Sequence, residues 1–469
     1  MQKFRRYLAY KVDPLFQYRR FCGSRSSASS DDWWSPALIL AILNSIPGWG
    51  NVRGIFVDFS TTQLSLGDNA VALTMAVDGK NFDVKNATYN ILGSNETHHA
   101  MWSAATSQTL VIPFKMARYS SPSPVIICIS PQFVAEQWQM FLMHVHTAHR
   151  FGGHLHVYIT SIVRSYFDLM KEYERQGYMT MDFWLRMKFA NSETPYFEPN
   201  GNIEWRNQAS AETDCLLQYK EAAEYIAFFD MDDILFPKNH ATYLEEFNAE
   251  WLIQPNASSL LYGRREHEFV KAETLSSFSF HELVTSLRSS KLVKRGKVVV
   301  KPTRYNSTWI HYSQHEDHST RRRIDSPSLV HVQRPLQKHS SNNMTKLWRM
   351  EFGPLNETIR EKDVLAIEED FWRMRNQSII QEIAKILPST DFYLPIVFKC
   401  YYDAFYGPVM VEKTGLHHCP NADLCDLPQR EDYKCVHSDA EYYSGPNTKP
   451  FTFHWSSRSR WSYDIGCYQ

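Results

Sequence analysis

The chain has no excess of charge of either sign. It holds 50 Lys and Arg against 51 Asp and Glu, for a formal net charge of -1. No whole-chain field therefore favours nucleic acid or an anionic membrane surface as a partner. It also lacks internal repeats and long low-complexity segments. Its 43% hydrophobic and 22% charged residues are typical of a globular protein large enough for one large domain or two.

A hydrophobic run long enough to span a bilayer is missing as well. The first apolar stretch, ALILAILNSI at 37–46, is short and is bracketed by Pro36 and Pro47. It fits either a signal-peptide core placed unusually late or a buried helix of a soluble domain. We therefore treat 1–53 as an N-terminal segment of uncertain structure, and it stays open whether the start of the chain is complete.

Glycosylation sequons, in contrast, are abundant. About two or three would arise by chance, and each becomes a glycan acceptor only in the secretory pathway. Seven Asn-x-Ser/Thr sequons occur, at Asn86, Asn95, Asn256, Asn306, Asn343, Asn356 and Asn376. The excess predicts a glycoprotein of the secretory pathway.

The cysteines lack any Cys-x-x-Cys pair, which disfavours a zinc site. Five of the eight lie in the last part of the chain, at Cys400, Cys419, Cys425, Cys435 and Cys467. Disulfides in an oxidising compartment are the favoured interpretation. Zinc, with His417 and His418 beside Cys419, is the alternative. We take 396–469 as a Cys-rich C-terminal tail.

The middle of the chain changes from alternating to βα patterning. Residues 54–120 are short, β-branched and alternating, which predicts a β-rich region ending at the SSPSP hinge. Strands expected at 125–130, 154–160, 178–185 and 225–233 then alternate with helices expected at 132–149, 165–177 and 211–224. This rhythm predicts an α/β domain with a mostly parallel sheet, which we place at 121–395.

Three carboxylates follow the last of these strands, in FFDMDDILFP at 228–237. Ligands of open α/β sheets bind at the carboxyl ends of strands. Strand alternation would put Asp230 and Asp232 on one side, with Asp233 next to them. Paired carboxylates suit a hard divalent cation such as Mn²⁺ or Mg²⁺. The plainer alternative is a solvated turn that caps the strand.

Two enzyme classes place Asp-x-Asp after an apolar strand. One is the haloacid dehalogenase-like phosphatases, in which Asp230 would be the nucleophile. The residues after the motif, Asp233 and Ile234, do not suit that class. The other is the nucleotide-sugar glycosyltransferases, which place the motif after several βα units, as here.

Several blocks resemble glycosyltransferase family 92, the DUF23 group abundant in nematodes. They are CISPQFVAEQWQMFLMHVHTAHRFGGHLHVYITSIV, EWRNQASAETDCLLQYKEAAEYIAFFDMDDILFP, YGRREHEFVKA, RGKVVVKP and SLVHVQRP, which follow in order within about 125–410. The resemblance implies a Rossmann-like GT-A fold and a metal-dependent inverting transfer of galactose from UDP-galactose to a glycan such as an N-glycan. It also implies a type II Golgi membrane protein, although no anchor is visible in this N-terminus. A catalytically inactive, glycan-binding member is a further alternative.

The resemblance also assigns residues of the metal site. Asp230 and Asp232 match the acidic pair that binds Mn²⁺ or Mg²⁺, and Asp233, at the third acidic position, is placed with the catalytic residues. A late histidine completes many GT-A metal shells. His311 and His331 are the candidates, with His311 preferred.

The general base and the donor contacts are chosen from nearby charged residues. The base could be Glu266, Glu268, Glu316 or Asp317, and Glu268 is favoured because REHEF follows a strand-like segment. For the UDP-sugar, Gln208, Asp214 and Glu136 are candidates for the nucleoside, Lys297 and Lys301 for the diphosphate, and Trp205 and Trp309 for stacking on a sugar. Solvated charge or core packing is the alternative for each.

Overall fold

The structure is a computed structural model that describes most of the chain from residue 118 onward. The described residues are 118–335, 352–406 and 422–467, apart from 187, 189, 191–199, 201–206, 306–307, 314–315, 317, 356–358, 423–424, 445–453 and 464–465. Six short strands between 58 and 116 are described by their backbone. The apolar stretch 37–46, Trp205, Asp317, His417, His418 and Cys419 lie outside the described residues.

One half of the central sheet is parallel. Its strand order is β10-β8-β7-β11, and each neighbouring pair runs in the same direction. The strands are β7 (Val125–Gln132), β8 (Gly153–Ile159), β10 (Met179–Phe183) and β11 (Tyr225–Phe229). The helices between them are α1 (Trp138–Arg150), α2 (Arg164–Arg175) and α3 (Gln208–Tyr219). The predicted α/β class is confirmed, and each element overlaps its expected range, with the first helix beginning six residues later than expected, at Trp138.

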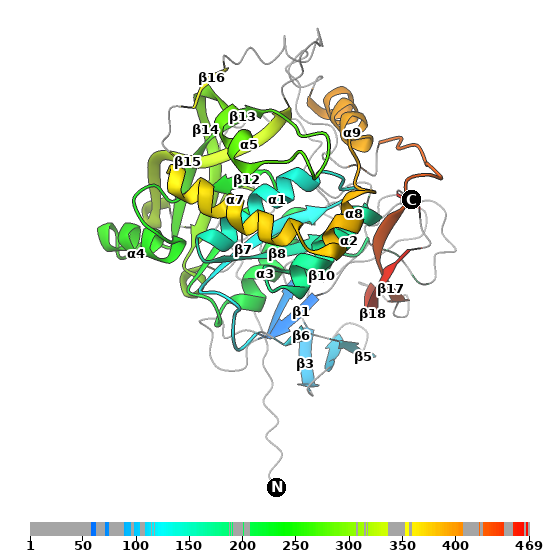
Figure 1. Cartoon of the computed structure of the whole chain (residues 1–469). Helices are drawn as coiled ribbons and strands as arrows, with labels where there is room; N and C mark the ends of the chain where they lie inside the picture. Colours follow the sequence, from blue (N-terminus) through cyan, green and yellow to red (C-terminus); the bar gives the residue numbers. More distant parts are fainter. Residues whose placement is uncertain are drawn as a thin grey trace.

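Both faces of this sheet are covered. Side chains of β7 alternate between two core clusters, with Ile127 in one and Ile126 and Cys128 in the other. Helices α1, α2 and α7 (Glu361–Arg375) contribute to the first cluster, and α3 contributes to the second. Figure 1 shows α7 crossing in front of α1. Burial on both faces explains why the strands are continuously apolar rather than alternating.

The other half of the sheet is mostly antiparallel, and sequence patterning did not predict it. The nine-stranded order continues from β11 as β14-β13-β15-β12, with β16 paired to β14. Its strands are β12 (Asp233–Leu235), β13 (Ser259–Phe269), β14 (Arg288–Val300), β15 (Arg321–Pro335) and β16 (Phe352–Pro354). Within it, β13 and β15 run parallel. The mixed sheet agrees with the GT-A fold that the resemblance implied.

The remaining helices surround this sheet. They are α4 (Tyr243–Ile253), α5 (Phe280–Ser286), α8 (Ser378–Ala384) and α9 (Tyr393–Tyr401), with short helical turns η3 (Pro302–Arg304), η4 (His318–Thr320) and η5 (Tyr402–Tyr406). Among the described residues, no helix combines the length and the apolar character needed to cross a bilayer.

Within the part of the chain that the structure describes, three disulfides join distant segments. In the tail, Cys400 pairs with Cys425 and Cys435 with Cys467, which confirms the disulfide interpretation for these four residues. The tail strands β17 (Cys435–Ser444) and β18 (His454–Ser462) extend from β9 (Ser161–Val163). The third disulfide, Cys128–Cys215, was not predicted and ties β7 to α3.

The segment before residue 118 is rich in strands, as predicted. Two three-stranded sheets are described, in the orders β2-β1-β6 and β3-β4-β5. Their strands are β1 (Asp58–Thr61), β2 (Val71–Thr74), β3 (Tyr89–Ser94), β4 (His98–Ser103), β5 (Gln108–Pro113) and β6 (Lys115–Met116). The domain boundaries given above stay predictions.

Candidate active site

The acidic segment forms a turn between two strands of the central sheet. Strand β11 ends at Phe229, the N–H of Asp233 donates to the carbonyl of Asp230 at 3.0 Å, and β12 begins at Asp233. The strand therefore ends earlier than expected, and strand alternation does not apply to Asp230 and Asp232. On the α1 side, the buried His144 ring donates from Nδ1 to the carbonyl of Met231 at 3.1 Å. Burial lowers the pKa of His144 to about 4, so the ring is neutral at pH 7.

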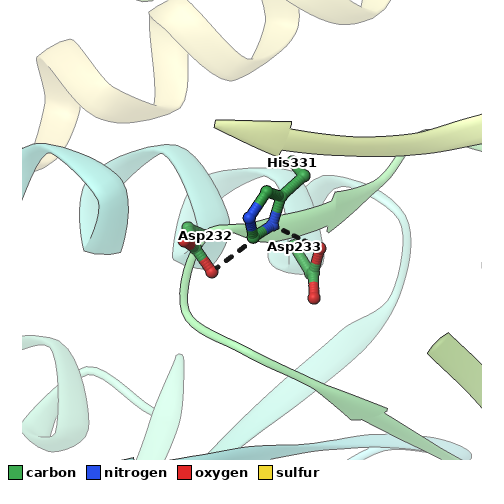
Figure 2. Close-up of side chains that lie close together, drawn as sticks. All are labelled: Asp232, Asp233 and His331. Atoms are coloured by element: carbon green, nitrogen blue, oxygen red, sulfur yellow. Dashed lines mark hydrogen bonds and ion pairs between the residues drawn. The ribbon is translucent and has the colours of Figure 1, made fainter. Parts of the chain in front are cut away.

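Asp232, Asp233 and His331 form a compact group of three (Figure 2). Strand β15 runs antiparallel to β12, and its register sets His331 opposite Asp233. The Nδ1 atom of His331 lies 2.8 Å from Oδ1 of Asp233 and 3.7 Å from Oδ1 of Asp232. One ligand atom from each of the three residues lies within 4.8 Å of the others.

The charges around this group are strongly coupled. Burial would raise the pKa of Asp233, but Arg264, 3.2 Å away, and His331 hold it well below its usual range. Burial would lower the pKa of His331, yet the carboxylates of Asp232 and Asp233 raise it to about 9. Burial raises the pKa of Asp232 to about 6. The buried charges of Asp233 and His331 thus stabilise each other, whereas burial and the neighbouring carboxylates disfavour the charge of Asp232.

The donor chemistry of these three residues fits a divalent cation. Two carboxylates and an imidazole nitrogen are suitable ligands for Mn²⁺, and carboxylates with water suit Mg²⁺. The side chain of Asp232 is 22% exposed, so one side of the group is open to solvent and to a ligand. The fully buried Asp233 lies at the same nitrogen, Nδ1, of His331.

Asp230 belongs to a neighbouring ion pair. Its Oδ2 lies 2.8 Å from Nζ of Lys297, and its Oδ1 accepts from Nε2 of Gln208 at 2.8 Å. The Lys297 ammonium is buried, donates to the carbonyl of Ile310 at 2.8 Å and lies 4.0 Å from Asp233. Gln208 also donates to Glu212, whose pKa burial raises to about 8. Gln208 and Lys297, two of the residues predicted to bind the UDP-sugar, therefore both lie at the acidic turn.

His331, rather than the preferred His311, is the histidine beside Asp232 and Asp233. The His311 ring donates from Nδ1 to the carbonyl of Gly296 at 3.0 Å. Burial and the neighbouring Lys297 and Arg264 lower the pKa of His311 to about 4. Among the described residues, His311 is not part of the three-residue group.

Lys301 lies away from the acidic turn. Strand β14 runs antiparallel to β11 and pairs Phe228 with Val298 and Ile226 with Val300. Lys297 therefore lies near the carboxyl end of β11, whereas Lys301 lies near Tyr225 at its start, with its ammonium 5.9 Å from that ring. Lys301 is four residues further along than Lys297, which corresponds to about 13 Å along a strand.

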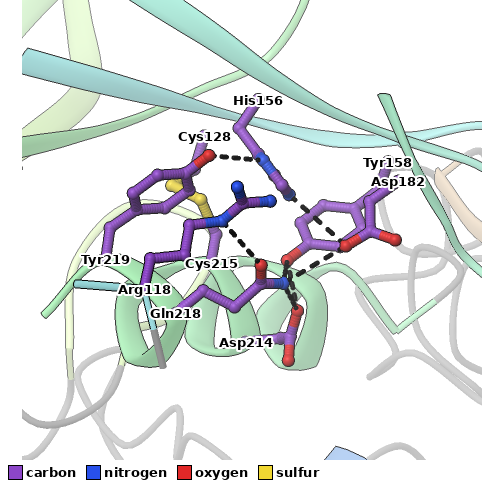
Figure 3. Close-up of a disulfide and its surroundings, with 9 residues drawn as sticks. All are labelled: Arg118, Cys128, His156, Tyr158, Asp182, Asp214, Cys215, Gln218 and Tyr219. Carbon is purple, nitrogen blue, oxygen red and sulfur yellow. Dashed lines mark hydrogen bonds and ion pairs between the residues drawn. A yellow bond between two sulfur atoms is a disulfide. The ribbon is translucent and has the colours of Figure 1, made fainter. Parts of the chain in front are cut away.

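Asp214 and Glu136, two other residues predicted to bind the UDP-sugar, instead make contacts that hold the fold together. Asp214 accepts from the hydroxyl of Tyr158 and from Nε2 of Gln218, beside the Cys128–Cys215 disulfide (Figure 3). Glu136 accepts from the backbone N–H groups of Phe392 and Leu394, at 2.8 Å each. The carboxylate of Glu136 therefore holds the start of α9 to α1.

The glutamates considered as the general base differ in burial and in their partners. Glu266 is buried beside His331, and its Oε2 lies 3.7 Å from Nε2 of that ring. Glu268 is 19% exposed and pairs with Arg288 at 3.5 Å. Glu316 accepts from Ser258 at 2.5 Å and pairs with Arg321 at 2.8 Å, so it supports the start of β13.

Sequence reasoning missed Arg264 and His144. Both act through residues far away in the chain, since Arg264 pairs with Asp233 and His144 holds the Met231 carbonyl. The only sequence signal for Arg264 was its place just after the strand-like SLLYG. His144 carried no signal beyond its position on an apolar helix.

Comparison with known proteins identifies the class to which this fold and site belong. The chain matches the model of glycosyltransferase family 92 over residues 123–375. It is 60% identical over 446 residues to the glycosyltransferase family 92 protein ZK381.2 of Caenorhabditis elegans, covering 88% of each chain. It is 37% identical over 464 residues to the family 92 protein F55C10.4 of the same organism, covering 86% of this chain and 88% of that one. The chain belongs to glycosyltransferase family 92, as its sequence blocks predicted.

Solved structures show a more distant similarity. S. aureus TarS 1–349 in complex with UDP-GlcNAc aligns with a TM-score of 0.25 and 10% identity, over 54% of this chain and 72% of that one. That score is too low to support a conclusion about the donor. Family membership itself favours a glycosyltransferase over a haloacid dehalogenase-like phosphatase.

Proposed function

We propose that this glycosyltransferase is a metal-dependent inverting enzyme that moves a hexose, galactose from UDP-galactose, onto a glycan acceptor. The observation that carries the proposal is the Asp232–Asp233–His331 group beyond the carboxyl end of β11 in a family 92 chain. Galactose as the sugar, UDP as the carrier and a glycan such as an N-glycan as the acceptor follow from the family resemblance.

In this proposal the acidic turn binds the diphosphate side of the donor. Asp232 and His331, with Asp233 behind them, would hold Mn²⁺ or Mg²⁺. A bound cation there supplies positive charge that stabilises the leaving UDP. Lys297 adds a buried ammonium at the same turn, and Gln208 fixes the Asp230 carboxylate that pairs with it.

An inverting transfer also needs a base for the acceptor hydroxyl. Glu268 remains our candidate because its side chain keeps some exposure, two residues beyond Glu266 on β13. It would take the proton of the acceptor hydroxyl as the acceptor oxygen bonds to the anomeric carbon of the sugar and the bond from that carbon to UDP breaks.

We also propose that the protein works in the secretory pathway, in the Golgi lumen. Three disulfides support an oxidising compartment. Among the described sequons, the side chains of Asn256 and Asn376 are exposed, as glycan acceptors must be.

A transfer assay tests this function. Purified protein is incubated with Mn²⁺, N-glycan acceptors and UDP-galactose, UDP-glucose or UDP-N-acetylglucosamine in turn, and products are read by mass spectrometry. The proposal predicts a gain of one hexose from UDP-galactose that EDTA abolishes. Transfer from another donor would overturn the galactose assignment. Glycan binding with no transfer from any donor would support the inactive-member alternative.

A further inference from the structure

Glu266 is a buried carboxylate beside His331 that the three-residue group does not include. The parallel register of β13 and β15 sets Glu266 next to His331. Its side chain is 4% exposed, so it is closed to solvent and to a large acceptor. A buried anion at this position needs a partner to stabilise it.

The two nitrogens of the His331 ring face different carboxylates. Nδ1 faces Asp233 at 2.8 Å and Asp232 at 3.7 Å, whereas Nε2 faces Oε2 of Glu266 at 3.7 Å. Only Nδ1 therefore points toward the group that could hold a cation. Histidines that bind metals usually donate their other N–H to a carboxylate or carbonyl, which fixes the tautomer and the orientation of the ring.

Glu266 is itself held in place by a lysine. The ammonium of Lys294, on β14, lies 3.1 Å from Oε1 of Glu266. This contact occupies Oε1, whereas Oε2 faces Nε2 of His331 at an ion-pair distance of 3.7 Å. A chain of contacts thus runs from Lys294 through Glu266 to the ring of His331.

We propose that Glu266 is a positioning residue whose carboxylate, 3.7 Å from Nε2 of His331, attracts the Nε2–H side of the ring, so that Nδ1 is presented with Asp232 and Asp233 to a divalent cation. Lys294 fixes Glu266 in this role. Glu266 is thereby removed from the candidate bases, because its side chain is 4% exposed and is paired with Lys294 and His331. This inference rests on the proposed metal-dependent function.

The test is the affinity for Mn²⁺, measured by the electron paramagnetic resonance signal of the free ion, with and without saturating UDP. The variants are Glu266→Ala, Glu266→Gln and Lys294→Met. Glu172→Gln is the matched control, because Glu172 is also buried (3% exposed) and paired with an arginine at 2.5 Å, but on α2. The melting temperature of each variant reports structural damage separately.

We expect Glu266→Ala to weaken Mn²⁺ binding on the order of 10- to 100-fold. Glu266→Gln should lose less, because its amide oxygen still presents a negative dipole to Nε2–H, and Lys294→Met should lie between them. Glu172→Gln should lower the melting temperature to a similar extent without changing the Mn²⁺ affinity. If Glu266→Ala fails to fold, the other two variants carry the test.

The outcomes separate this inference from the proposed function. Wild-type protein that binds Mn²⁺, together with Glu266 and Lys294 variants that bind it within twofold of wild type, would overturn the positioning role alone. Wild-type protein that binds no Mn²⁺ would overturn the metal-dependent function, and this inference with it.

Discussion

The three carboxylates of the acidic turn differ in how closely they are paired. Asp230 pairs with Lys297 and Gln208, whereas Asp233 pairs with Arg264 and His331. Asp232 is left with the longest contact, 3.7 Å to His331, and with partial exposure to solvent. At the residue scale, Asp232 is therefore the carboxylate best placed to meet a ligand.

Substitutions of Lys297 and Lys301 provide a matched test of the proposed UDP-binding site. Lys297→Met should weaken UDP binding roughly 10- to 100-fold, because it removes the buried ammonium that fixes Asp230 at the acidic turn, a charge-assisted contact of about 1.5–3 kcal/mol. Lys301→Met should leave it nearly unchanged, since Lys301 lies at the opposite end of β11. Isothermal titration of UDP into both variants measures this. Equal losses would contradict the placement of the two lysines.

His144 should stabilise the turn through one hydrogen bond. His144→Leu leaves the Met231 carbonyl without its donor and should lower the free energy of unfolding by about 1–3 kcal/mol. His144→Asn should recover much of this loss, because its amide nitrogen can take the place of Nδ1. Urea denaturation of the three proteins provides the comparison, and equal stability of the two variants would exclude the hydrogen bond as the cause.

At the scale of elements, the site depends on how α3 is fixed to the sheet. Helix α3 carries Gln208 at its start and Cys215 further along, and Cys215 is bonded to Cys128 of β7. The disulfide thus links the helix that holds Asp230 to the strand next to β11.

Removing this disulfide should be costly. The Cys128→Ala, Cys215→Ala double variant should lose roughly 2–5 kcal/mol of stability. Its residues are 87 apart, against 25 for Cys400 and Cys425, so replacing the tail pair should cost less if loop entropy dominates. Chemical denaturation without reductant measures both. A larger loss for the tail pair would show that the core disulfide is not the main covalent constraint.

Sequence patterning predicted one half of the sheet and not the other. Strands and helices from β7 to β11 follow one another locally, and their burial on both faces makes them continuously apolar. The pairs β11–β14, β13–β15 and β12–β15 join segments far apart, and no local period encodes their register. For that reason the acidic segment could be predicted from the sequence, whereas His311 was wrongly preferred to His331 as the histidine beside it. Sequence patterning also could not show that Lys297 lies at the acidic turn and Lys301 at the opposite end of β11.

At the scale of the whole molecule, buried histidines should make the fold sensitive to acid. Burial lowers the pKa values of His144, His154 and His267 to about 4 each. In the unfolded chain a histidine titrates near 6.5. Between these two values, the unfolded state takes up protons that the folded state does not, so stability falls as the pH falls from about 6.5 to 4.

His154 allows this pH dependence to be tested away from the acidic turn. It lies on β8, is 5% exposed and bonds to the hydroxyl of Thr180 at 2.9 Å. His154→Gln should remove up to about 3 kcal/mol of the acid-induced loss between pH 6.5 and 4. The exposed His281→Gln serves as the control. Urea denaturation at several pH values measures both, and parallel curves for wild type and His154→Gln would contradict the prediction.

The central claim is that the Asp232–Asp233–His331 group holds a divalent cation that binds UDP, and one titration tests it most directly. UDP is titrated calorimetrically into wild-type protein, Asp232→Asn and the exposed control Asp403→Asn, each with Mn²⁺ and then with EDTA. The account predicts binding only with Mn²⁺, lost in Asp232→Asn and kept in Asp403→Asn. UDP binding that is the same in EDTA, or that survives in Asp232→Asn, would contradict it.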